Sequence, residues 1–183
     1  MIKLIFITGN QKKLVQVKEA LKGYDIEIIN QKIETPEIQD TDCRKIAEFS
    51  AKFACEQIKK PVVVTDAGYY IEALNGFPGP FIKFVNQWFK PSDLLKLMKG
   101  VKNRTVKSPI CVAYCEPNKN PISFVSDNLG SIAGNPEGEG STIDQLYIPK
   151  GYSKPMGTLH EDERLSLWNI ECWKQLAEYL TNK

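Results

Sequence analysis

The sequence has little of several features that would assign it to a specialised class. It contains one histidine and five cysteines, with no Cys-x-x-Cys pair of the kind that zinc and redox sites use. No apolar stretch approaches the length of a membrane span. The 24 basic and 22 acidic residues leave a formal charge of +2, which argues against a protein that coats nucleic acid. We therefore expect a cytoplasmic protein with reduced thiols and with neither a membrane nor a nucleic acid as partner.

The remaining composition is that of a folded domain. Hydrophobic residues make up 42% of the 183 residues, which is enough to bury a sizeable core. The sequence has no internal repeat and no low-complexity tract. We therefore expect a single domain over residues 1–183.

Hydrophobic periodicity predicts an α/β fold class with a mixed sheet. Two strand–helix–strand patterns open the chain, and antiparallel strand patterns follow. In chain order the predicted elements are strand 2–8, helix 11–22, strand 24–30, helix 42–59, strand 62–64, a short helix from 92, strands 109–116 and 122–133, a strand at about 143–148 and helix 161–181.

The junction between the first strand and the first helix suits an anion. The apolar run ends at Thr8-Gly9-Asn10, and the helix pattern begins at once. The first N–H groups of a helix lack partners, and together with Lys13 they supply positive potential for a phosphate. An ordinary helix N-terminus capped by Asn10 has the same sequence. Only candidate binding or catalytic residues elsewhere in the chain can distinguish an anion site from an ordinary cap.

A carboxylate follows the third predicted strand. Residues 62–64 form a buried pattern that brings Asp66 to the strand's carboxyl end, where open α/β sheets bind their ligands. A carboxylate there can bind Mg²⁺ or accept a proton from water. The alternative is a turn aspartate that caps the next segment.

Two further candidates for the binding site are weaker when each is taken alone. Glu37 follows Pro36, which stiffens the loop and can aim the carboxylate inward, although a solvated glutamate is the default. The loop over residues 76–83 is rich in glycine, proline and aromatic residues and can wall a flat ligand, with Lys83 near its phosphates.

Taken together, four segments resemble the inosine triphosphate pyrophosphatase family, also described as Ham1-like, of which this chain would be a divergent member. The resemblance implies an elongated, two-lobed α/β fold around a mixed sheet, with a nucleotide cleft between the lobes and usually a homodimer. It also implies Mg²⁺-dependent hydrolysis of purine nucleoside triphosphates such as ITP, dITP and XTP to the monophosphate and pyrophosphate. The four segments are Thr8-Gly9-Asn10 with Lys13, residues 31–37, Thr65-Asp66 and residues 73–84.

The same resemblance implies roles for individual residues. Thr8-Gly9-Asn10 and Lys13 would hold the triphosphate, and Lys83 would add positive charge. Glu37 and Asp66 would bind the metal, and Asp66 would also serve as general base for the attacking water.

Several positions depart from the family pattern. A glutamate expected after Lys13 is Gln16, and the acidic residue expected before Asp66 is Thr65, which lowers the negative charge available to Mg²⁺. The family's base-clasping Phe-Gly-Trp-Asp-Pro is replaced by residues 141–145, which retain only Asp144 as a binding residue.

The C-terminal base-recognition positions differ as well. The family's Ser-His-Arg donates hydrogen bonds to the 6-keto oxygen, but here Leu167 or Trp168 stands in place of the histidine and arginine. Losing such donors relaxes or redirects base discrimination. Arg164 or His160 are candidates to replace them, although a histidine before a helix is typically a cap or solvated. Trp168 and Trp173 can stack on a purine or belong to the core or an interface.

Three possible functions follow. The first is a nucleoside triphosphate pyrophosphatase with altered base preference. The second is a catalytically weak or inactive sensor that binds a nucleotide such as dITP and reports it to a partner protein, for example in bacterial defence against phage. A third is an assembly subunit with no nucleotide affinity.

Overall fold

The computed structural model describes all 183 residues and divides them into two compact units, each with one five-stranded sheet. Unit 1 comprises Met1–Asp66, Ile110–Ser126 and Ile170–Lys183, and unit 2 comprises Ala67–Pro109 and Asp127–Asn169. Six α-helices accompany the sheets. The predicted α/β class is therefore confirmed, although two sheets replace the one expected. The single domain over residues 1–183 stays a prediction.

The sheet of unit 1 is mixed, as the sequence predicted. Its strand order is β2-β1-β3-β7-β8. Strand β1 runs parallel to β2 and β3, whereas β7 and β8 run antiparallel to each other. The strands are β1 (Ile2–Ile7), β2 (Ile26–Gln31), β3 (Val62–Ala67), β7 (Ile110–Cys115) and β8 (Ile122–Ser126). All six residues of β7 are buried, because helices cover both faces of this sheet.

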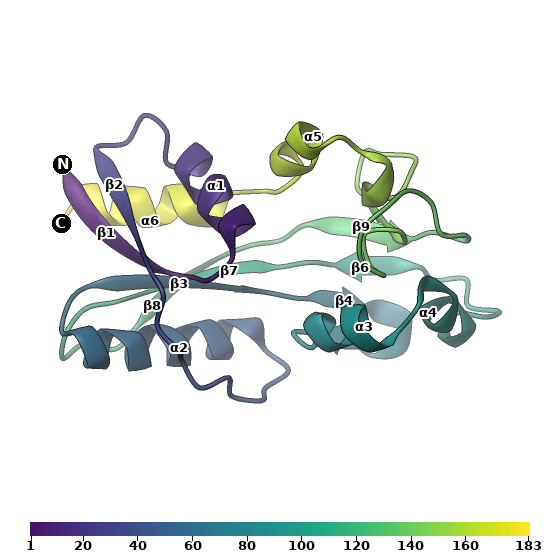
Figure 1. Cartoon of the computed structure of the whole chain (residues 1–183), viewed down its shortest axis with the longest axis horizontal. Helices are drawn as coiled ribbons and strands as arrows, with labels where there is room; N and C mark the ends of the chain where they lie inside the picture. The colour runs from purple at the N-terminus through teal and green to yellow at the C-terminus, as the bar shows by residue number, and fades with distance from the viewer. The chain divides into compact units, whose positions relative to one another are not determined.

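Figure 1 shows helix α2 on one face of this sheet and helices α1 and α6 on the other. These helices are α1 (Gln11–Ala20), α2 (Cys43–Ile58) and α6 (Glu171–Thr181). On the second face, Phe6 of β1 packs edge-on against Trp173 of α6, with ring centroids 5.5 Å apart. Trp173 is therefore a core residue.

The buried face of α2 differs from the one its large side chains indicate. Ile46, Phe49, Phe53 and Ile58 follow a near-helical spacing, yet Phe49 is 40% exposed. Small residues form the buried face instead, which lets the helix backbone approach the sheet closely. These buried residues are Cys43, Ala47, Ser50, Ala51, Ala54 and Cys55.

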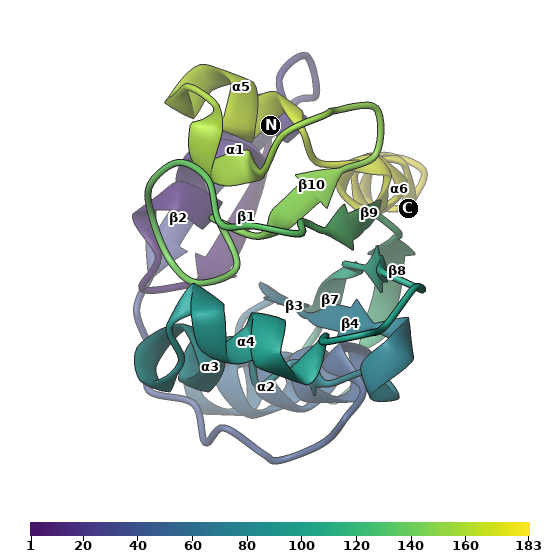
Figure 2. The same cartoon turned by 90° about the vertical axis from the view of Figure 1, so that its right-hand side faces the viewer.

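The sheet of unit 2 is antiparallel throughout, with strand order β10-β9-β6-β4-β5. Figures 1 and 2 show α3 and α4 on the side of β4, and α5 on the side of β9 and β10. The elements are β4 (Tyr69–Ile71), β5 (Pro78–Gly79), α3 (Ile82–Trp88), α4 (Pro91–Leu97), β6 (Thr105–Lys107), β9 (Leu129–Ile132), β10 (Tyr147–Pro149) and α5 (Glu161–Ser166), with short 3₁₀ turns at Glu72–Leu74 and Met156–Thr158.

Most predicted elements differ from the observed ones by a few residues at their ends, and three differ more, two of which break where the chain changes unit. The strand expected over 122–133 is two strands, β8 in unit 1 and β9 in unit 2. The helix expected over 161–181 is two helices, α5 in unit 2 and α6 in unit 1. The strand expected at 143–148 begins only at Tyr147, because the preceding residues form turns.

Side chains next to these breaks hold each half in its own unit. In unit 1, the Ser126 hydroxyl accepts a hydrogen bond from the Cys172 N–H (2.6 Å). In unit 2, Asn128 Oδ1 accepts from the Asn169 N–H (2.7 Å). Neither partner can be deduced from hydrophobic periodicity, because each lies more than 40 residues away in the sequence.

All five cysteines are buried free thiols. None of the helices combines the length and apolar character needed to cross a membrane.

A single residue, Gly68, separates β3 from β4. Gly68 does not have a positive φ, so a left-handed turn does not explain the glycine. Close approach explains the glycine instead, since a Cβ atom there would lie 2.7 Å from the backbone carbon of Gly79 in β5.

We therefore expect Gly68→Ala to destabilise the fold by about 2 kcal/mol, because backbone atoms must move to admit the methyl group. Urea unfolding of the full chain measures this. Gly134→Ala is the matched control, because that glycine has open space around its Cβ position and no positive φ. Equal stability of the two variants would contradict the close-approach explanation.

Candidate functional site

The end of β1 and the start of α1 form a capped corner. Asn10 Oδ1 accepts a hydrogen bond from the Lys12 N–H (2.9 Å), and the Asn10 N–H donates to Thr8 Oγ1 (3.0 Å). Asn10 is thus the helix cap, as the alternative interpretation held. No acidic residue occupies the first turn of α1, so the positive potential of the helix start is not cancelled there. The cap and the anion site are compatible.

Asn30, on the neighbouring strand β2, fixes the backbone of this corner. Its Nδ2 donates to the carbonyl oxygens of Thr8 (3.0 Å) and Phe6 (3.3 Å). The sequence analysis did not single out this residue. The signal that would have found it is the parallel register of the two strands, which places Asn30 opposite Phe6.

Lys13 joins this corner to the end of β3. Its Nζ donates to the carbonyl oxygen of Thr65 (2.9 Å). Burial lowers the pKa of the Lys13 ammonium from its ordinary value, and the nearby Asp66 carboxylate opposes that shift. The structure therefore brings together two motifs that lie more than 50 residues apart in the sequence.

Asp66 and Thr65 lie at the carboxyl end of β3 on opposite faces of the strand, because strand side chains alternate. Val62 and Val64 belong to the core of unit 1, and Asp66 follows on their face with a partly exposed side chain. The Thr65 hydroxyl is buried and has no hydrogen-bond partner. An unsatisfied buried hydroxyl of this kind costs about 1–3 kcal/mol.

Lys32 is a further cation that the sequence analysis did not assign. The register of the parallel strands pairs Ile7 with Gln31, so the next residue, Lys32, emerges beside the corner. A Cβ atom on Gly9 would lie 3.9 Å from Lys32 Cε. The Lys32 ammonium is exposed and makes no ion pair or hydrogen bond, so it is available to an anion.

Glu37 is exposed, in the irregular segment between β2 and α2. Its part in metal binding stays a prediction. Groups of three or more His, Cys, Asp or Glu side chains that could hold a metal ion are absent. Mg²⁺ commonly takes only one or two protein carboxylates and completes its shell with water and substrate phosphates. The oxygen donors near Lys13 therefore fit a Mg²⁺ ion that binds together with a polyphosphate.

Lys83 and Asp144 belong to unit 2, and their predicted binding roles stay predictions. Lys83 is exposed in the first turn of α3. Asp144 Oδ2 accepts from both the backbone N–H and the hydroxyl of Ser141, each at 2.8 Å. The Asp144 carboxylate therefore organises its own turn.

His160 and Arg164, the candidate replacements for the base-recognition donors, both support local structure. His160 is the exposed N-cap residue of α5, and its backbone N–H donates to Glu163 (3.1 Å). The Arg164 guanidinium donates to the carbonyl oxygens of Leu159 (3.0 Å) and Gly157 (2.9 Å). Neither geometry indicates a site for a base.

Comparisons with known proteins agree with the family resemblance and the fold. The model of the Ham1 family matches residues 4–168. The dITP/XTP pyrophosphatase of Methanopyrus kandleri is 34% identical over 99% of this chain and 97% of its own length. That of Methanosarcina mazei is 39% identical over 90% of this chain and 89% of its own length. A HAM1 protein from Coxiella burnetii has the same fold, with a TM-score of 0.80 at 22% identity over the whole of both chains.

The placement of Lys13 predicts selective loss of polyphosphate affinity. Lys13→Met should weaken triphosphate binding at least tenfold and monophosphate binding less, because charge-assisted hydrogen bonds are worth roughly 1.5–3 kcal/mol each. Calorimetric titration of the full chain measures both affinities. Lys18→Met, at an exposed position on the same helix, is the control. Equal losses for the two ligands would place Lys13 away from the terminal phosphates.

Proposed function

Since the chain belongs to the Ham1 family, we propose that it hydrolyses purine nucleoside triphosphates to the monophosphate and pyrophosphate. The names of the curated relatives support this reaction class and make dITP and XTP the first substrates to test. The observation that carries the proposal is the hydrogen bond from Lys13 to Thr65. It holds a cation between a helix start that suits an anion and the carboxylate of Asp66.

The first task of the site is to hold the phosphates. Asn10 caps the Lys12 N–H, and the dipole of α1 still favours an anion at the helix start. Lys13 is held in place before any ligand arrives, so little of its binding energy is lost in ordering the side chain. Lys32 adds a second, exposed charge next to the end of β2.

The second task is to activate water. When water adds to phosphorus it loses a proton, and we assign Asp66, at the end of β3, as the carboxylate that accepts it. The neighbouring Lys13 ammonium carries the opposite charge to this carboxylate. The same cation also faces the negative charge that develops on the phosphate oxygens during the reaction.

We assign Mg²⁺ as the metal and Asp66 and Glu37 as its protein ligands. When bound, the ion neutralises phosphate charge and orients the phosphate oxygens. Thr65 in place of an acidic residue leaves fewer negative charges for the ion, and metal affinity follows that count. Glu37→Gln should therefore raise the Mg²⁺ concentration needed for half-maximal activity, while substrate saturation at high Mg²⁺ changes little.

Pyrophosphate release from dITP, XTP, ITP and the standard triphosphates tests the proposal directly. Asp66→Asn should lower kcat by roughly 10²–10⁴-fold, the usual contribution of a general base. Asp162→Asn, in an exposed first turn of α5, is the matched control and should retain full activity. Binding of the same nucleotides is measured in parallel.

The paired measurements also separate the alternatives. Tight nucleotide binding by the wild-type chain without any turnover would replace the enzyme with a nucleotide sensor. Failure to bind any of the triphosphates would favour an assembly subunit. The homodimer and the cytoplasmic location implied by the resemblance stay proposals, and sedimentation of the purified chain tests the first.

A further inference from the structure

The hydrogen-bond ladder between β1 and β3 stops at the candidate phosphate corner, before β3 ends. Its last pair is Phe6 with Val63, although β3 continues to Ala67. If the same register continued, the next N–H of β1 to face β3 would be that of Gly9. Its partner would be the Thr65 carbonyl, because an N–H in a parallel pair bonds to the carbonyl one place before the residue opposite.

The alternation along β1 supports this direction for the Gly9 N–H. Strand β1 lies between β2 and β3 in the sheet, so its N–H groups point alternately toward the two neighbours. The Ile2 N–H donates to the Asp25 carbonyl (2.8 Å), directly before β2. Even-numbered residues of β1 therefore face β2, and odd-numbered residues face β3.

Asn30 extends this alternation beyond the end of the strand. Its Nδ2 donates to the carbonyl oxygens of Thr8 (3.0 Å) and Phe6 (3.3 Å), which therefore point toward β2. The peptide bond between Thr8 and Gly9 is trans, and a trans peptide is planar with its C=O and N–H on opposite sides. Because Asn30 holds the Thr8 carbonyl on the β2 side, the Gly9 N–H is turned toward β3.

On the β3 side, Lys13 occupies the carbonyl that this N–H would otherwise use. The Lys13 ammonium donates to the Thr65 carbonyl (2.9 Å). Gly9 is exposed, and its N–H makes no hydrogen bond within the chain. A side-chain cation thus replaces one backbone hydrogen bond of the ladder and leaves a backbone donor open beside the end of β3.

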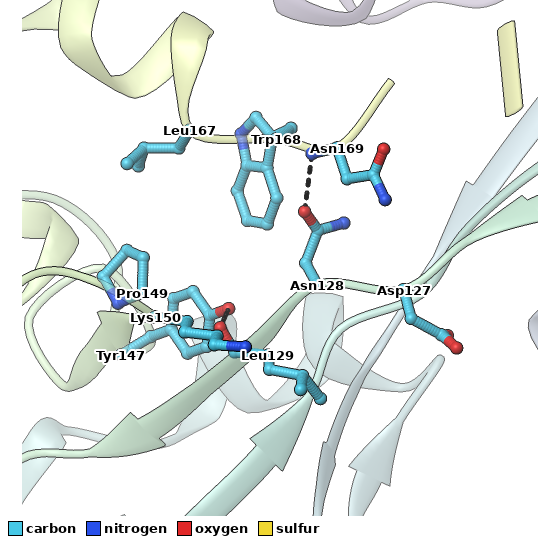
Figure 3. A pocket seen from close by; sticks show the side chains of 9 residues that line it. All are labelled: Asp127, Asn128, Leu129, Tyr147, Pro149, Lys150, Leu167, Trp168 and Asn169. Carbon is cyan, nitrogen blue, oxygen red and sulfur yellow. Dashed lines mark hydrogen bonds between the residues drawn. The ribbon is translucent and has the colours of Figure 1, made fainter. Parts of the chain in front are cut away.

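An asparagine in unit 2 shows a different use of the same side chain. Figure 3 shows Asn128 Oδ1 accepting from the Asn169 N–H (2.7 Å), and Asn128 Nδ2 donates to the Ser108 carbonyl (3.1 Å). That carboxamide satisfies a backbone N–H as well as a carbonyl. Asn30 instead binds carbonyl oxygens only, so the neighbouring N–H stays available to a ligand.

We propose that Asn30 is a positioning residue of the candidate phosphate corner, which directs the Gly9 N–H at an oxygen of a bound phosphate chain next to Lys13. The choice of a phosphate chain rests on the proposed function. Asn30 itself does not touch the ligand and acts only through the peptide between Thr8 and Gly9. Because this peptide is fixed before binding, little free energy is lost in ordering the donor.

Inorganic tripolyphosphate tests this donor without a base and without turnover. In ¹H–¹⁵N spectra of the full chain, the Gly9 amide proton should move downfield as tripolyphosphate is added, because a hydrogen bond to an anion is charge-assisted. The resonance is identified by its loss in Gly9→Ala. The amide of Gly134, an exposed glycine of unit 2, should not move and controls for unspecific effects of the anion.

Variants of Asn30 test the positioning role. Asn30→Leu removes the amide donor at similar size, and it should weaken tripolyphosphate binding roughly five- to tenfold and reduce the shift of the Gly9 resonance. Asn30→Gln keeps the donor and should recover most of the affinity, which a general loss of stability would not explain. Asn120→Leu, the same exchange at an exposed asparagine before β8, should bind like the wild type. Urea unfolding checks that each variant is folded.

Three results would overturn the proposal: no binding of tripolyphosphate by the wild-type chain, binding that leaves the Gly9 resonance in place, or wild-type affinity in Asn30→Leu. These failures are distinct from failure of the proposed function. A chain that releases pyrophosphate from dITP while tripolyphosphate leaves Gly9 unmoved retains the activity and loses the role of Asn30. A chain that shifts Gly9 as expected but turns over no triphosphate retains that role and loses the proposed activity.

Discussion

The hydrogen bond from the Lys13 ammonium to the Thr65 carbonyl is the contact on which the candidate site of unit 1 depends. It ties the first turn of α1 to the end of β3, next to Asp66. Burial disfavours the charged form of Lys13, so the cation stays there only because the carbonyl dipole and the nearby carboxylate compensate. In the proposed function, a bound polyphosphate would add further compensation for the buried charge.

The chain passes between its units between β8 and β9 and between α5 and α6, and side-chain hydrogen bonds to backbone N–H groups hold both places. Ser126 and Asn128 are separated by one residue, yet Ser126 accepts from the start of α6 in unit 1 and Asn128 from the end of the α5–α6 connection in unit 2. Each side chain satisfies a backbone N–H that the interrupted helix pattern leaves without a partner. These two hydrogen bonds therefore help to define where the chain passes from one unit to the other.

The positions that match the family pattern and those that depart from it lie in different units. At the candidate phosphate corner of unit 1, Asn30 donates hydrogen bonds to the backbone and Lys32 lies close to Gly9. At the C-terminal positions that depart from the pattern, Trp168 lies in unit 2 and packs against Tyr69 and Tyr147.

The sequence by itself determined the α/β class, the strand–turn–helix corner at Thr8-Gly9-Asn10, the buried strand before Asp66 and the family resemblance, because these depend on local periodicity and on residue types at short spacing. Only the tertiary structure decided that the small residues of α2 face the sheet, that Asn30 and Lys32 join the corner, and that the last predicted helix is two. Those outcomes depend on strand register and on hydrogen bonds between residues far apart in the chain. Local sequence patterns contain no information about strand register or about hydrogen bonds between distant residues.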